Sequence, residues 1–283
     1  MTTPTGPEPG THNPDNYCYR HPDRQSFVLC QRCGRTVCGE CQTPAPVGVR
    51  CPQCMAADRA SVPKRRRVAT DAPKVTYALM IICAVVYAAQ WVTQYFNVPI
   101  IDALGVYHPG YTDLQHGVYE PWRMLTSVFL HGSPLHLAFN VLTLWIFGRA
   151  LEPLFGRLRF ALLFLTAGLG GSLAVALISP NIWVVGASGA VFGLFGAWFV
   201  VLRRMKADMT PMLVLIGINV VVAFLNEGIA WEAHLGGLVV GALCGWLILR
   251  DHDKAFKTRA SVWAMIAIAI GCVVLATAVG ALR

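Results

Sequence analysis

Four polar side chains lie near the beginnings of three apolar stretches: His136 and Asn140 in HGSPLHLAFN, Ser188 in GASGAVFG, and His234 in EAHLGGLVVG. A serine hydroxyl becomes a nucleophile when a histidine within hydrogen-bond reach removes its proton. Taken singly, Ser188 is most simply a packing residue and each histidine an interhelical hydrogen-bonding group. Taken together, the four groups have complementary chemical roles and favour chemistry over packing.

Eight cysteine and histidine residues near the N-terminus form a second candidate site. They fall into pairs with two intervening residues: Cys18/His21, Cys30/Cys33, Cys38/Cys41 and Cys51/Cys54. This spacing brings two soft ligands to one tetrahedral ion, so eight ligands suit two structural zinc ions. The short gap between the second and third pairs favours interleaved ligation, with the first and third pairs on one ion and the second and fourth on the other. Sequential pairing stays open.

The interleaved spacing resembles that of B-box or RING-like zinc fingers. Both sites are fully ligated, so we expect structural zinc and no cofactor for catalysis. Disulfide bonds are a weaker alternative, because the correctly spaced histidine fits metal ligation and a cytosolic location is reducing. A module this small has little core of its own and would depend on metal to fold.

The remaining chain must position the polar set, and its composition points to a membrane. Only 13% of the residues are charged and 55% are hydrophobic. Apolar blocks predict transmembrane helices at 75–96, 134–150, 160–178, 183–202, 211–226, 233–249 and 261–282. The fifth is short for a span. We therefore expect an all-α polytopic membrane protein, divided into a disordered tail (1–16), a two-zinc module (17–57), a basic juxtamembrane linker (58–74) and a membrane domain (75–283).

Lysine and arginine residues predict the orientation. Sixteen of them lie in the flank before the first block and in alternate loops after it, whereas the opposite loops and the C-terminus hold only Arg123 and Arg283. Such residues concentrate on cytoplasmic loops. We expect a plasma (inner) membrane protein with a cytosolic N-terminus and an extracytoplasmic C-terminus. The run KRRR at 64–67 fits this topology and contact with the lipid bilayer better than nucleic-acid binding, so no nucleic acid is expected.

This topology places the polar set at one depth. The second, fourth and sixth blocks all begin on the extracytoplasmic side, and each polar residue lies in the first or second turn of its helix. Glycines follow Ser188 at 189, 193 and 196, and follow His234 at 237, 241 and 245. Small residues at such spacings let two helices approach until their backbones nearly touch. Ser188 and His234 are therefore expected to meet.

These residues resemble the motifs of the rhomboid intramembrane serine proteases. The resemblance covers about residues 75–282 and lies in Trp122-Arg123, His131-x-x-x-x-His136-x-x-x-Asn140, Gly186-x-Ser188-Gly189 and Ala233-His234-x-x-Gly237-x-x-x-Gly241. It implies a six-helix catalytic bundle, here with a seventh transmembrane helix added at the C-terminus. It also implies a Ser188–His234 dyad that cleaves transmembrane protein substrates, with His136 and Asn140 stabilising the oxyanion. The fifth helix, hinged near residues 226–231, would control lateral access of substrate.

Two other functions remain as alternatives. A catalytically inactive rhomboid-like protein would bind and escort membrane clients, but the presence of both Ser188 and His234 argues against it. A transporter or channel would use the histidines as a proton relay, but the chain lacks internal repeats and paired acidic groups. The zinc module is expected to recruit a cytosolic protein partner or substrate tails, with a structural or regulatory appendage as the other interpretation.

Overall fold

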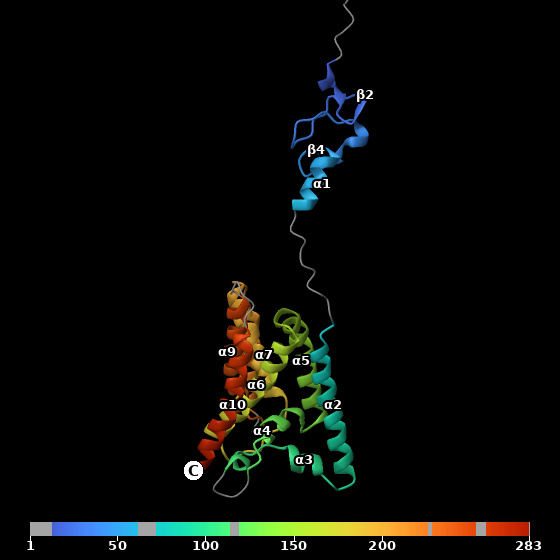
Figure 1. The fold of residues 1–283 in the computed structure, drawn as a ribbon. Helices are drawn as coiled ribbons and strands as arrows, with labels where there is room; N and C mark the ends of the chain where they lie inside the picture. The colour runs from blue at the N-terminus through green and yellow to red at the C-terminus, as the bar shows by residue number, and fades with distance from the viewer. Residues whose placement is uncertain (1–12, 62–71, 114–118, 226–227, 253–258, 283) are drawn as a thin grey trace, which may run out of the picture. The chain divides into compact units, whose positions relative to one another are not determined.

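The computed structural model describes residues 13–61, 72–113, 119–225, 228–252 and 259–282. The chain separates into two compact units, Met1–Val68 and Ala69–Arg283 (Figure 1). Several predicted features lie outside the described residues: the tail at 1–12, the basic run at 64–67 with most of the linker, and the hinge residues 226 and 227.

The first unit is a small module of short elements. They are η1 (Pro14–Asn16), β1 (Tyr17–Cys18), β2 (His21–Gln25), η2 (Gly39–Cys41), β3 (Thr43–Pro44), β4 (Val49–Arg50) and α1 (Pro52–Ser61). The strands pair as two antiparallel ribbons, β1 with β2 and β3 with β4. Apart from Val37, the buried apolar side chains of this unit are cysteines. Among the described residues, the interior of this unit is thus mostly cysteine side chains, because so short a segment offers little else to bury.

The expected boundaries of the module shift at both ends. Residues Pro14–Asn16, placed in the disordered tail from sequence, form the 3-10 helix η1, with the Asn13 side chain accepting a hydrogen bond from the Asp15 N–H. Residues 58–61, placed in the linker, are the last turn of α1. The ordered module is therefore longer than the cysteine spacing alone indicates.

The second unit is helical. Its long helices are α2 (Lys74–Tyr95), α5 (Pro134–Phe155), α6 (Arg157–Ile178), α7 (Ser188–Arg204), α8 (Thr210–Leu225), α9 (Trp231–His252) and α10 (Ala260–Ala281). Between α2 and α5 lie α3 (Ile100–Gly105), η3 (Pro109–Thr112), α4 (Arg123–Thr126) and η4 (Ser127–Phe129). Within the described residues, five helices, namely α2, α5, α6, α9 and α10, are long and apolar enough to cross a membrane. The predicted multi-pass, mostly helical protein with a small cysteine-rich module is confirmed.

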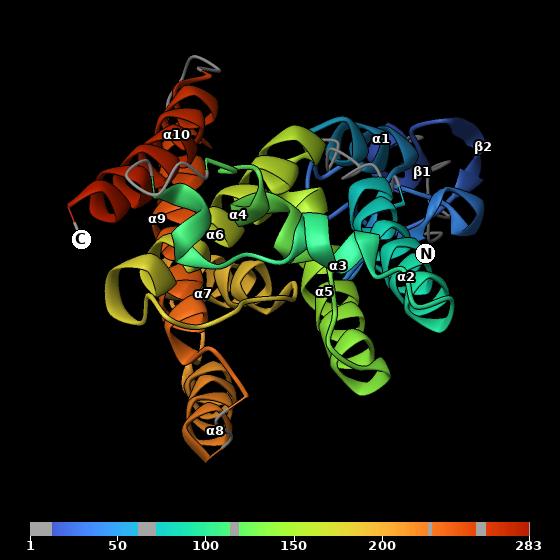
Figure 2. The ribbon, with the colours of Figure 1, turned by 90° about the horizontal axis from the view of Figure 1, so that it is seen from below.

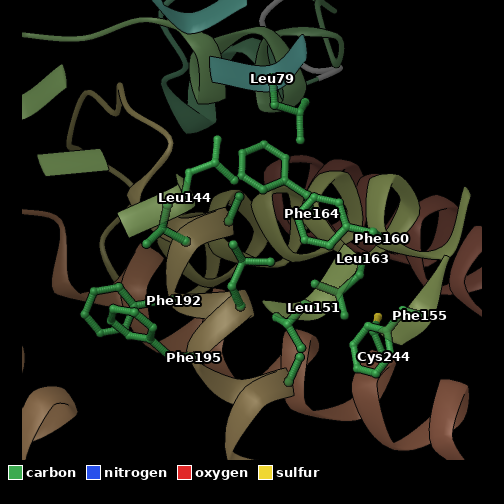
Figure 3. Close-up of a cluster of buried hydrophobic side chains, with 14 of the residues drawn as sticks. Leu79, Leu144, Leu151, Phe155, Phe160, Leu163, Phe164, Phe192, Phe195 and Cys244 are labelled. Carbon is green, nitrogen blue, oxygen red and sulfur yellow. The ribbon is translucent and has the colours of Figure 1, made fainter. Parts of the chain in front are cut away.

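Helices α6, α7 and α9 form the centre of the bundle. In an 18-residue apolar segment of α6, 67% of the residues are buried inside the protein, whereas in the corresponding segment of α10 only 17% are buried. Phe160 and Phe164 of α6 and Phe192 and Phe195 of α7 belong to one buried cluster (Figure 3). Helix α8 lies at the edge of the bundle, with most of its large side chains exposed (Figure 2). The central helices therefore form the rigid part of this unit.

The fourth predicted span begins later than its hydropathy indicates. The apolar block starts at residue 183, but α7 begins at Ser188. Upstream of the helix, Val184 forms an isolated antiparallel bridge with Tyr107: the Tyr107 N–H donates to the Val184 carbonyl at 3.2 Å and the reverse bond is 2.8 Å. Bridge pairing satisfies the backbone groups of Val184 without a helix. The prediction of 183 as the helix start was wrong, and α7 has 17 residues.

Candidate active site and metal centres

Ser188 is the first residue of α7, and the backbone before it is sharply bent. Gly186 has φ +119°, a value that side-chain-bearing residues rarely adopt. The Gly186 N–H donates to the Ser127 carbonyl at 2.8 Å, which joins this bend to η4. The first N–H groups of a helix have no intrahelical acceptor. The Ser188 N–H is therefore suited to bind an anion beside the serine hydroxyl.

His234 is the fourth residue of α9, in its first turn, and α9 meets α7 through glycines. A Cβ placed on Gly237 would lie 1.9 Å from the Gly189 carbonyl oxygen. A Cβ placed on Gly189 would lie 3.2 Å from the carbonyl oxygen of Ala233. The residue after Ser188 thus packs on the residue before His234, at backbone contact. The predicted close approach of these two helices is confirmed.

Nδ1 of the His234 ring is buried and has no hydrogen-bond partner among the described residues. Instead the ring stacks on Phe192, with centroids 4.2 Å apart and planes 8° from parallel. Among the described residues no hydrogen bond joins the Ser188 hydroxyl to His234. Catalytic hydrogen bonds often tighten only when substrate binds.

His136 lies against the bend that precedes Ser188. A Cβ placed on Gly186 would lie 2.5 Å from Cε1 and 2.7 Å from Nε2 of His136, so only glycine fits beneath this ring. The buried Asn140 donates from Nδ2 to the His136 carbonyl at 3.0 Å. These contacts bring His136 to the serine end of α7 and place Asn140 one helical turn behind it.

Behind His136 lie His131, which belongs to the motif read from the sequence, and Gln90, which does not. The buried Gln90 of α2 accepts a hydrogen bond from the His131 N–H at 2.9 Å and donates to Asp102 at 2.6 Å. The His131 ring is edge-on to His136, with centroids 5.2 Å apart. Sequence reasoning passed over Gln90, although a polar residue inside an apolar block is itself a reason to expect a hydrogen-bonding role.

The eight N-terminal metal-ligand residues form two separate tetrads. Within each, one ligand atom per residue lies within 4.8 Å of every other: Cys18, His21, Cys38 and Cys41 form one tetrad, and Cys30, Cys33, Cys51 and Cys54 the other. Nδ1 of His21 lies 3.8, 3.3 and 3.5 Å from the sulfurs of Cys18, Cys38 and Cys41. The interleaved grouping favoured from sequence is the one the structure has, and sequential pairing was the wrong alternative.

The spacing within the tetrads fits a tetrahedral metal ion. With Zn–S bonds of about 2.3 Å and Zn–N bonds of about 2.0 Å, ligand atoms at the corners of a tetrahedron lie about 3.8 Å apart for S···S and about 3.5 Å apart for S···N. The sulfurs of Cys33 and Cys51 are 3.8 Å apart. Both tetrads could therefore hold zinc with little rearrangement, and each supplies the four ligands of a closed structural site.

Thiol acidity in the module divides into two classes. Burial opposes ionisation of Cys18 and Cys30, but backbone N–H donors outweigh it and lower the pKa of each thiol to about 6. Burial and the neighbouring Cys18 raise the pKa of Cys41 to about 11, and a hydrogen bond from the Cys54 thiol to Cys51, together with burial, raises the pKa of Cys54 to about 12. Crowded thiolates repel one another, so only some ionise easily without a nearby cation.

Comparison with known proteins supports the membrane site. The rhomboid domain family matches residues 119–251. The chain is 39% identical over 158 residues to the rhomboid protease GluP of Bacillus subtilis, covering 54% of this chain and 31% of the relative. It is 36% identical over 143 residues to the putative rhomboid protease YdcA of the same organism, covering 48% of this chain and 72% of the relative.

A third relative is human. Rhomboid-related protein 3 is 30% identical over 190 residues, covering 58% of this chain and 46% of the relative. The chain thus spans less than half the length of GluP and of the human protein. Serine, both histidines and asparagine of the candidate site all lie inside the matched domain. The predicted resemblance is confirmed: this multi-pass membrane protein belongs to the rhomboid family.

Proposed function

We propose that the protein is an intramembrane serine endopeptidase that hydrolyses peptide bonds in or near the transmembrane segments of other proteins. The observation that carries this proposal is the backbone contact of α7 with α9 beside Ser188 and His234. This contact supports Ser188 as a nucleophile at the N-terminus of α7 and His234 as its general base on the adjoining helix. The family membership and the rhomboid proteases among the relatives support the same chemistry.

In the proposed reaction, Oγ of Ser188 attacks the carbonyl carbon of the scissile bond while His234 takes the hydroxyl proton. The Ser188 N–H, His136 and Asn140 hold the resulting oxyanion. When the C–N bond breaks, His234 gives the proton to the leaving amine and the acyl group remains on Ser188. A water molecule, deprotonated by His234, then releases the product and restores the serine.

The membrane arrangement belongs to the same proposal. All seven long helices would span the bilayer. The 17-residue α7 is surrounded by protein and need not match the full hydrocarbon thickness, and the 16-residue α8 is close to the roughly 17 residues that the shortest spans use. The distribution of lysine and arginine supports a cytosolic N-terminus and an extracytoplasmic opening of the active site in the plasma (inner) membrane. Helix α8, the most exposed of the bundle, would move to admit substrate from the lipid.

For the N-terminal module we propose two structural zinc ions, one on each tetrad. The ligand separations support this, as does an interior made almost entirely of cysteine side chains. Zinc would hold the module folded and take no part in peptide hydrolysis. The folded module, ending in α1, would then bind a cytosolic protein partner or the cytosolic tails of substrates.

The catalytic proposal is tested with purified full-length protein in liposomes and a reporter protein with one transmembrane segment. Ser188→Ala and His234→Ala should each abolish cleavage. Thr143→Val is the matched control, since it removes an exposed hydroxyl that bonds only to its own helix at the Phe139 carbonyl. Cleavage by Ser188→Ala at the rate of the unaltered protein would reject the proposal. Binding of the reporter without cleavage by the unaltered protein would favour the client-escort alternative.

A further inference from the structure

Helix α10 lies outside the matched family domain, yet its C-terminal end packs against the segment that precedes the active site. A Cβ placed on Gly280 would lie 2.9 Å from the Thr112 carbonyl oxygen and 3.2 Å from Cα of Asp113. The helix backbone therefore rests directly on η3. Figure 1 shows this end of α10 at the end of the bundle that also carries α3 and α4.

The segment that α10 contacts is joined to the bend before Ser188. Tyr107, two residues before η3, makes both backbone hydrogen bonds of the bridge to Val184. His108 and Tyr111 pack on Trp183, with ring centroids 4.7 and 5.9 Å apart. Residues 183 and 184 lead directly into Gly186 and Ser188. Displacement of η3 therefore moves the backbone that carries the nucleophile.

A shared core cluster makes a second connection. Cys272 and Ala276 of α10 are buried together with Tyr107, Val184 and Ala233. Ala233 immediately precedes His234, and its carbonyl faces Gly189. Well-packed interiors transmit displacement because they contain few voids. One side of α10 thus packs against both the bridge residue Val184, which precedes Ser188, and the first turn of α9, which carries His234.

The opposite end of α10 is also fixed. The Ser261 N–H donates to Asp251 of α9 at 2.7 Å, and Arg159 of α6 donates to the Ser261 hydroxyl at 3.0 Å. These bonds satisfy a backbone donor at the N-terminus of α10, where a helix lacks internal partners. The helix is held at one end by α6 and α9 and presses on η3 at the other.

We propose that α10 is a positioning element for the active site, acting through Gly280, η3 and the Tyr107–Val184 bridge to set the backbone at Ser188. The inference rests on the proposed serine-protease function and adds to it a helix beyond residue 251. Neither α10 nor Gly280 touches substrate. The position of α10 would set the alignment of Ser188 and its N–H donor. Displacing this helix should therefore lower kcat more than it changes KM.

The test compares side chains added at two glycines of the same helix. Gly280→Ala and Gly280→Val push on Thr112, whereas Gly271→Val is the matched control because a Cβ there meets nothing within 4 Å. In full-length protein, Gly280→Val should lower kcat about ten- to hundredfold with KM nearly unchanged, and Gly280→Ala by less. Labelling of Ser188 by a small alkyl fluorophosphonate should slow in parallel. Gly271→Val should match the unaltered protein.

Thermal unfolding of each variant, with Ser188→Ala as the inactive reference, separates the outcomes. If Gly280→Val is unfolded at the assay temperature, the smaller Gly280→Ala carries the test by its kcat and labelling rate. Equal kcat and labelling for the Gly280 variants and Gly271→Val would overturn the role of α10 while the protease proposal stood. A rise in KM alone would overturn it as well. Cleavage that survives Ser188→Ala would instead remove the proposed function itself.

Discussion

The two candidate sites of this protein are built in opposite ways. The eight metal-ligand residues of the N-terminal module come from one short stretch, and their side chains are nearly its whole interior. Ser188 and His234 come from separate helices whose positions depend on backbone contacts between glycines. The proposed zinc ions would hold the first site and its fold together, whereas the second site is positioned by helix packing that does not involve these ligands. The two should therefore fail independently and for different reasons.

Removal of metal should give the largest effect. A tight zinc chelator applied to the full-length protein at pH 7 should unfold the module, because zinc binding to such sites contributes on the order of 10 kcal/mol that is also folding free energy. Limited proteolysis should then cut between residues 17 and 61, and added zinc should restore protection. Cleavage of the reporter in detergent should stay within about twofold, since the membrane unit has its own core.

A module that resists protease after complete loss of metal would contradict its dependence on metal for folding. Loss of reporter cleavage on chelation, with the membrane unit still folded, would contradict the independence of the membrane site from the metal. Metal content measured on the same samples shows whether two ions per chain are released. Each tetrad would hold one ion independently of the other. Cys30→Ser should therefore weaken the binding of one zinc ion and leave the Cys18 tetrad loaded.

Loss of the His136 side chain should give the next largest effect. His136→Ala should lower kcat about 10²- to 10³-fold, the usual result of removing one donor to an oxyanion, with little change in KM. The His136 ring lies over Gly186, two residues before Ser188, and we therefore expect it to act on the reacting carbonyl. Thr143→Val, on the same helix, is the control. A change in KM with kcat intact would show that His136 binds substrate and does not stabilise the transition state.

The contrast also explains what the sequence could predict. Cys30 and Cys33 are close because two residues separate them, so local spacing was enough to pair the ligands and to favour the interleaved grouping, which the structure has. The contact of Gly237 with Gly189 was predictable because small residues recur on one face of each helix. The start of α7 was not predictable from the sequence, because Trp183 and Val184 continue an apolar block. The pairing of Val184 with Tyr107 keeps these residues out of the helix. The contact of Gly280 with Thr112 likewise depends on tertiary packing that no local pattern encodes.

Separating α7 from α9 should have a smaller but clear effect on stability. At Gly237→Ala the new Cβ would overlap the Gly189 carbonyl, and overpacking of this kind typically costs about 1–3 kcal/mol. Gly217→Ala on α8 is the matched control, because its Cβ meets nothing and alanine favours a helix. Unfolding in detergent should show the loss only for Gly237→Ala, together with slower fluorophosphonate labelling. Equal stability of both variants would mean that the glycine contact does not position the dyad.

The smallest effect should come from the ion pairs of the zinc module. Asp58 pairs with both Arg32 and Arg50, and Arg32 also donates to the carbonyl of the ligand Cys54 at 3.2 Å. Partly exposed pairs contribute about 0–1 kcal/mol, so Asp58→Asn should speed zinc transfer to a chromophoric chelator by no more than about fivefold. Glu40→Gln, which breaks the more exposed pair with Arg24, should leave the rate unchanged. A much larger effect of Asp58→Asn would mean that α1 holds the second tetrad together, and that metal ligands alone do not build this module.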